Sequence, residues 1–208
     1  MAERKFTIRG KAKKSIFSPD ELFNYLKTEK GLMSAFLYHA LISFIFLLLN
    51  AIVLFATGTT TISWAFTLFG FAAALGFAAL FIFLWVLMIA ANFVAAAIGH
   101  AFAKLFGAKK GFAETYKAAS YGFTPAALLG WLPIIGTVFI FQALYYTVNG
   151  MSILQNMSRR RAFAAALIPI IIFFAMAAAF FFGMLVLVFD SAIMSAAWLD
   201  KAAAWSAR

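Results

Sequence analysis

The sequence predicts an all-α, polytopic integral membrane protein with five transmembrane helices and a short amphipathic helix near the N-terminus. Of its 208 residues, 65% are hydrophobic and only 12% are charged, whereas a typical soluble domain is about half apolar and roughly a quarter charged. Residues 31–103, 118–158 and 162–189 contain no charged side chain. Each of these stretches exceeds the roughly 20 apolar residues that a membrane-spanning helix requires. A soluble fold is therefore excluded.

Residues 1–32 are predicted to be a cytoplasmic basic arm followed by an amphipathic helix. The arm, residues 1–17, shows no helical apolar period, and its cations are expected to contact anionic lipid headgroups: Arg4, Lys5, Arg9, Lys11, Lys13 and Lys14. Ser18, Pro19 and Glu21 have the spacing of a capping box, which predicts a helix start there. The apolar side of this helix either lies in the headgroup plane or belongs to a solvated helix that leads into the first span.

The first span is predicted over Met33 to Thr57, and no cleaved signal peptide is expected because a mostly polar segment precedes it. The next apolar run is too long for one crossing of about 30 Å and too short for two crossings with a turn. We therefore predict one long helix over Phe71 to Leu105, with breaks at Gly70 and Gly76. Residues 63–69 are expected at the outer interface.

The remaining elements are a polar turn, three further spans and an interfacial tail, predicted over residues 113–117, 118–129, 133–155, 162–189 and 191–208 respectively. The transmembrane domain as a whole is predicted to cover residues 33–190. Pro125 interrupts the third span, because proline lacks the backbone N–H that a helix needs. The carbonyl freed by Pro125 requires a polar partner at membrane depth, and we expect Gln142 or Tyr146 on the fourth span to pack there.

Loop charges predict the orientation. The loops after the first and third spans carry no lysine or arginine, whereas the N-terminal region and the loops after the second and fourth spans are basic. Basic loops face the cytoplasm. This alternation requires an odd number of spans with the N-terminus inside and the C-terminus outside, in a multi-pass cell-membrane protein.

Residues 100–162 resemble the YIP (Ypt/Rab-interacting protein) domain family. The resemblance rests on the order of several short motifs: Leu105-Phe106-Gly107, Lys110-Gly111-Phe112, Tyr121 four residues before Pro125, Trp131-Leu132-Pro133, Gly136, Gly150 and a basic run that enters the last span at Ala162. The DLxGP motif and the long N-terminal region of eukaryotic members have no counterpart here. The resemblance therefore implies a prokaryotic-type member in the plasma membrane, without an expectation of GTPase binding.

Polar side chains within the predicted spans are the candidate functional residues, because each needs a partner or a water-filled cavity. They recur at helical spacing and are taken as one intramembrane polar cluster: His39, Asn50, Asn92, His100, Tyr121, Gln142, Tyr146 and Asn149. The cluster either lines a cavity or forms hydrogen bonds between helices. A water-filled cavity around Gln142, Tyr146 and Asn149 would favour transport, and a dry, hydrogen-bonded core would favour a scaffold.

Small residues recur every four positions on the second helix, at Ala91, Ala95, Gly99 and Ala103. This stripe allows another backbone to approach closely. The neighbour is either another helix of the chain or the same helix in a second copy.

Enzymatic chemistry is not expected. The chain has no cysteine and two histidines, and Glu114 is the single carboxylate between Met33 and Phe189. Nothing therefore indicates a catalytic triad, a zinc site or a cofactor site. The basic residues that flank the apolar runs indicate contact with anionic lipid rather than with nucleic acid. The sequence predicts a non-enzymatic membrane scaffold or adaptor that contacts lipids, other membrane proteins or a second copy. The alternative is a small pore, a lipid-handling protein or a transporter subunit.

The predicted topology is testable by cysteine labelling, since the chain has no native cysteine. A Lys110→Cys variant should be protected from a membrane-impermeant maleimide in intact cells and labelled after lysis. A Thr60→Cys variant should be labelled in intact cells. The opposite pattern would refute the threading.

Overall fold

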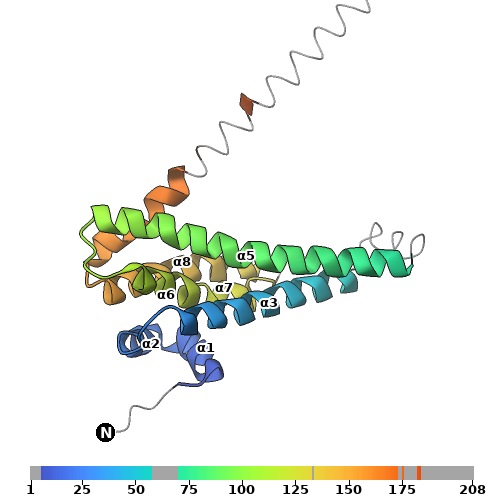
Figure 1. The fold of residues 1–208 in the computed structure, drawn as a ribbon, viewed down its shortest axis with the longest axis horizontal. Coiled ribbons are helices and arrows are strands. Elements are labelled where there is room, and N and C mark those ends of the chain that lie inside the picture. Colours follow the sequence, from blue (N-terminus) through green and yellow to red (C-terminus); the bar gives the residue numbers. More distant parts are fainter. Residues whose placement is uncertain (1–5, 58–69, 133, 173–174, 176–181, 184–208) are drawn as a thin grey trace, which may run out of the picture. The chain divides into compact units, whose positions relative to one another are not determined.

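The computed structural model describes residues 6–57, 70–132, 134–172, 175, 182 and 183, and these contain helices and turns but no strand. The all-α prediction is confirmed. The chain divides into two compact units, Met1–Ala166 and Leu167–Arg208. The first unit contains helices α1 to α3 and α5 to α8 (Figure 1).

Three helices in the described part of the chain are long and apolar enough to cross a membrane: α3 (Met33–Ala56), α5 (Phe71–Leu105) and α8 (Ile135–Leu154). Their bounds agree with the predicted first, second and fourth spans. The break before α5 occurs at Gly70, which has a φ of 49° that glycine adopts readily. Gly76 lies inside α5, so the second predicted break was wrong. Residues 63–69 lie outside the described residues.

The predicted third span consists of two short helices, α6 (Phe112–Gly122) and α7 (Thr124–Leu129). The predicted interruption near Pro125 is confirmed, because Pro125 sits in the first turn of α7, where its missing N–H is tolerated. The turn predicted over residues 113–117 was wrong, since these residues form the first turns of α6. Glu114 lies in the first turn of α6, where its negative charge suits the helix dipole.

The next described helix begins at Arg159 and is described to residue 172. It starts slightly before the predicted fifth span. Most of that span, and the tail over residues 191–208, lie outside the described residues.

The N-terminal region forms two helices, α1 (Ile8–Phe17) and α2 (Pro19–Leu26). The prediction of an arm without helix was therefore wrong over residues 8–17. Thr7 caps α1 by accepting a hydrogen bond from the Gly10 N–H at 3.1 Å. Helix α2 begins at Pro19 as predicted, but Ser18 makes no side-chain cap, so the full capping box is not formed.

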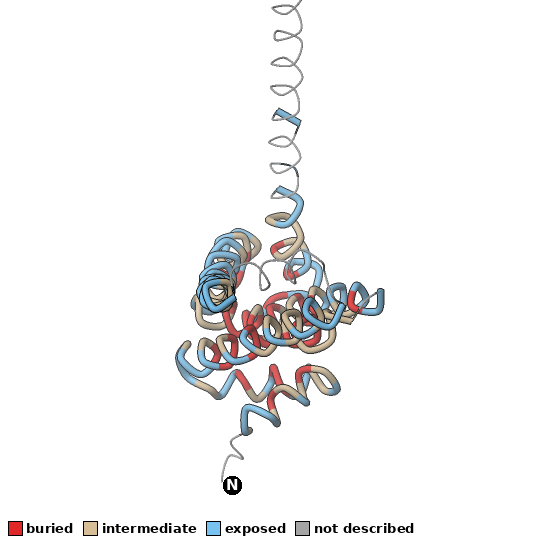
Figure 2. The backbone as a smooth tube through the Cα atoms, turned by 90° about the vertical axis from the view of Figure 1, so that its right-hand side faces the viewer, coloured by how far each residue is buried: buried red, intermediate tan, exposed pale blue. Residues whose placement is uncertain are grey.

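The apolar side of α2 is buried against the protein (Figure 2). Leu22, Phe23 and Leu26 are each 0% exposed. The Phe23 ring lies directly over Gly150 of α8, where an added Cβ would lie 2.6 Å from a ring carbon. This face therefore lies neither in the headgroup plane nor in solvent, because α8 offers it a closely fitting apolar surface.

Helices α6 and α8 also pack with almost no space between their backbones. A Cβ added at Gly122 would lie 2.8 Å from the Thr147 Cα and 2.3 Å from its Oγ1. Even a methyl group at Gly122 therefore cannot be accommodated without moving the two helices apart. Gly122 thus sets the distance between α6 and α8.

Substitution of Gly122 tests this packing. Gly122→Ala should lower the free energy of unfolding by about 1–3 kcal/mol through overpacking, measured by denaturant unfolding in detergent micelles. Gly99→Ala is the matched control, because no atom lies within 4 Å of a Cβ added there, and it should be neutral or slightly stabilising. Equal destabilisation by both variants would contradict the close-approach argument.

Candidate functional site

A buried polar layer joins the two N-terminal helices to the rest of the first unit. Lys117 of α6 has a side chain that is 1% exposed. Its Nζ donates hydrogen bonds to the backbone carbonyls of Leu26 and Glu29 and forms an ion pair with the Glu114 carboxylate at 3.0 Å. Lys117 thus satisfies carbonyls at and beyond the end of α2, where helical partners are missing.

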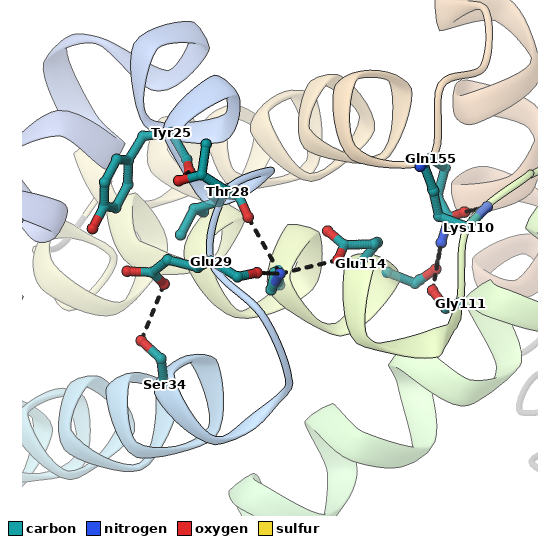
Figure 3. Close-up of polar contacts among 11 residues, drawn as sticks. Tyr25, Thr28, Glu29, Ser34, Lys110, Gly111, Glu114 and Gln155 are labelled. Carbon is teal, nitrogen blue, oxygen red and sulfur yellow. Dashed lines mark hydrogen bonds and ion pairs between the residues drawn. The ribbon is translucent and has the colours of Figure 1, made fainter. Parts of the chain in front are cut away.

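A second buried lysine, Lys11 of α1, binds Glu29 in the same linker between α2 and α3. The Lys11 ammonium pairs with the Glu29 carboxylate and donates to the Ser34 hydroxyl at 2.9 Å and to the Tyr121 hydroxyl at 3.2 Å. Glu29 also accepts a hydrogen bond from Ser34 (Figure 3). Glu29 is therefore held by cations from two different helices, through its carboxylate and through its backbone.

The carbonyl freed by Pro125, that of Tyr121, has polar partners as the sequence requires, and two hydroxyl groups supply them. The Tyr121 carbonyl accepts hydrogen bonds from the Ser15 hydroxyl and from the Thr124 hydroxyl, the latter at 2.8 Å. Gln142 and Tyr146, the residues of α8 expected to pack there, form their hydrogen bonds with each other and with the Ile16 carbonyl. Ser15 reaches this position because α1 packs against α6 and α7.

The polar face of α8 binds the N-terminal helices. Gln142 Nε2 donates to the Tyr146 hydroxyl at 2.7 Å, and that hydroxyl donates to the Ile16 carbonyl at 3.0 Å. Asn149 Nδ2 donates to the Asp20 carboxylate. The polar residues of α8 therefore orient α1 and α2.

Three other members of the predicted polar cluster have separate hydrogen-bond partners, whereas the buried ring nitrogens of His39 have none among the described residues. Asn92 donates to the Ser120 hydroxyl at 3.1 Å, the His100 ring bonds the Thr115 hydroxyl at 2.9 Å, and Asn50 donates to a carbonyl of its own helix. The His39 ring lies 5.8 Å from that of Phe123, centroid to centroid. The predicted residues thus belong to several local contacts rather than to one cluster.

Sequence reasoning missed Gln155, which is 0% exposed. Its Oε1 accepts from the Lys110 N–H at 2.9 Å, and its Nε2 donates to the Gly111 carbonyl at 2.9 Å (Figure 3). The sequence feature that could have indicated Gln155 is its position between an apolar helix and a run of three arginines. These bonds bring Lys109 and Lys110 to the same end of the unit as the segment that precedes the three arginines at 159–161.

The small-residue stripe on α5 is only partly in contact with the chain. Ala103 is 0% exposed, whereas Ala91 and Ala95 are exposed and no atom lies within 4 Å of a Cβ added at Gly99. Another helix of the described chain therefore does not cover the whole stripe. Contact with a second copy stays a prediction.

The predicted lipid-contacting cations also separate into groups. Lys11 is buried and ion-paired, so its assignment to lipid was wrong, and Lys14 pairs with the Glu21 carboxylate. Arg9 and Lys13 are exposed. Arg4 and Lys5 lie outside the described residues.

A cavity of about 450 Å³ lies between α3, α5, α6, α7 and α8. Its lining is apolar apart from Asn92 and Thr147, and it includes neither Gln142 nor Tyr146. Among the residues that the structure describes, no group of three or more His, Cys, Asp or Glu side chains could hold a metal ion. The geometry is that of a packed helical domain in which most buried polar side chains form hydrogen bonds within the protein, with His39 and the Tyr116 hydroxyl as exceptions among the described residues.

A sequence model of the Yip1 domain matches residues 13–181, which is most of the chain. The chain belongs to the Yip1 domain family. The match begins within α1 and so includes α2 and the polar layer around Lys117. Comparison with curated proteins and with solved structures gave no significant match.

The Lys117 contacts can be tested by removing the charge at constant length. Lys117→Met should lower the free energy of unfolding by about 3–5 kcal/mol, because the Glu114 carboxylate and two carbonyls lose their buried partner. Lys109→Met, at an exposed lysine, should change it by less than about 0.5 kcal/mol. Unfolding in detergent, followed by tryptophan fluorescence, would measure both, and similar values would contradict a buried structural role for Lys117.

Proposed function

We propose that this Yip1-family membrane protein is a non-enzymatic scaffold or adaptor that acts in membrane organisation. In this proposal five helices cross the membrane, with the N-terminus in the cytoplasm. Its working surface is the cytoplasmic end of the first unit, together with the N-terminal helices. Its partners are lipids, other membrane proteins or a second copy of the chain.

The proposal rests on the observation that the polar side chains of α8 form hydrogen bonds within the protein. Gln142, Tyr146 and Asn149 bind α1 and α2 directly or through one another. These hydrogen bonds support the scaffold alternative described for these residues. A transport path needs exposed polar groups along its length, whereas each of these side chains donates a hydrogen bond within the protein.

The carboxylates support the same conclusion. Each carboxylate within the described ranges is engaged by another residue: Asp20 by Asn149, Glu21 by Lys14, Glu29 by Lys11 and Glu114 by Lys117. An acid or base catalyst must be free to exchange a proton with substrate. These groups instead hold helices together.

The test is a Gln142→Leu variant, with Phe141→Leu as the control at an exposed neighbour. Gln142→Leu should lower the free energy of unfolding by about 0.5–1.5 kcal/mol, the net value of one hydrogen bond. The amounts of protein and lipid that co-purify per folded molecule from native membranes should equal those of the wild type and the control.

Transport would give a different result. If the proteoliposome-reconstituted wild type conducts a small solute above the rate of empty vesicles, and Gln142→Leu abolishes this flux without loss of stability, the scaffold proposal fails. The pore or carrier alternative would then hold.

A further inference from the structure

A shallow groove of about 340 Å³ lies between α8 and the start of the helix that begins at Arg159. It is lined by Tyr145, Val148, Asn149, Arg159, Arg160 and Phe163. It is separate from the cavity next to Asn92 and from the Lys117 layer. The groove therefore carries two arginines and an apolar wall in one small space.

The two arginines of the groove are not ion-paired in the described part of the chain. Both are exposed, and neither forms an ion pair with a residue that the structure describes. One carboxylate, that of Asp20, accepts a hydrogen bond from the groove residue Asn149, so two arginine charges face a single acidic group there. The mouth of the groove thus has a net positive charge and favours an anion.

One wall of the groove is apolar and exposed. Tyr145 and Phe163 are 57% and 49% exposed, so their rings offer uncovered apolar surface. Tyr145 lies about 14 Å from the C-terminal end of α8 at 1.5 Å per residue, whereas the arginines lie just beyond that end. Under the proposed topology, on which this step rests, the anion-binding end is at the membrane interface and the apolar wall extends from it toward the hydrocarbon core.

We propose that this groove binds one anionic phospholipid, with its phosphate on Arg159 and Arg160 and one acyl chain along Tyr145, Val148 and Phe163. Basic pockets between membrane helices commonly take anionic headgroups. A guanidinium group binds a phosphate through paired hydrogen bonds. This site differs from the predicted lipid contact of the N-terminal arm, because it is a saturable site on the helical bundle rather than a diffuse charged segment.

The test uses the delipidated full chain in a neutral detergent. Phosphatidylglycerol should bind at one saturable site and phosphatidylcholine should bind at least fivefold more weakly, measured by native mass spectrometry. An Arg159→Gln/Arg160→Gln variant should lose about fivefold in affinity for each arginine, equivalent to about 1 kcal/mol per cation near an anionic lipid. A Lys109→Gln/Lys110→Gln variant, with the same loss of charge at the same end of the unit, should lose less than twofold.

The apolar wall has its own test. Phe163→Gln should weaken phosphatidylglycerol binding severalfold, whereas Phe141→Gln, at another exposed phenylalanine of the bundle that does not line the groove, should not. Melting temperatures in the same detergent should confirm that all variants fold. Inorganic phosphate at the same concentration should not displace the lipid.

Three results would overturn the proposal. Equal losses in the arginine and lysine double variants would indicate unspecific surface charge. Equal effects of Phe163→Gln and Phe141→Gln would show that no chain lies in the groove. Full displacement by inorganic phosphate would assign the arginines to a soluble anion instead of a lipid.

Discussion

The arrangement of the first unit depends on a positive charge that is removed from water. An ammonium group that is 1% exposed, such as that of Lys117, is tolerated only if acceptors surround it, because desolvation of an unpaired ion costs several kcal/mol. Its acceptors come from Glu114 on its own helix and from backbone carbonyls at the end of α2 and in the following linker. The lysine can be satisfied only when α2 is docked, so the charge and the position of the N-terminal helices are coupled.

Close backbone packing makes that docking possible. At Gly150 the Phe23 ring occupies the space that a Cβ would fill, and at Gly122 the backbone of Thr147 does so. In a membrane, where lipid is as apolar as leucine, helices associate through van der Waals contact and interhelical hydrogen bonds rather than through the hydrophobic effect. Gly122 and Gly150 allow the close van der Waals contact. Tyr146, Asn149 and Lys117 form the hydrogen bonds.

The sequence predicts the long helices well because their signal is local. Length and apolarity define α3, α5 and α8, and Gly70 ends a run that is too long for one crossing. Gly76 shows the limit of that reasoning, because a glycine within a long helix costs only about 1 kcal/mol and need not break it. Pro125 correctly indicated an orphaned carbonyl, because the missing donor is a property of the residue itself.

The candidate site was less predictable because its partners are distant in the chain. Lys11 bonds Tyr121 across 110 positions, and Lys117 bonds Leu26 across 91. No spacing rule connects such pairs, so both lysines resembled ordinary loop or arm cations. Ser15 was not predictable for the same reason, because its hydroxyl finds the Tyr121 carbonyl only when α1 packs against α6 and α7.

The use of carboxylates inside the unit determines which cations remain outside. Glu21, Glu29 and Glu114 each neutralise a lysine of the N-terminal helices or of α6, and Asp20 is bound by Asn149. Neither Arg159 nor Arg160 forms an ion pair with a described residue, although Asp20 keeps its charge because its partner Asn149 is a neutral amide. These arginines lie five and six residues beyond Leu154, the last residue of α8, which is long and apolar enough to cross a membrane. The internal pairing that docks the N-terminal helices therefore leaves two arginines beside the groove without an ion-pair partner among the described residues, and the proposed lipid site rests on this surplus positive charge.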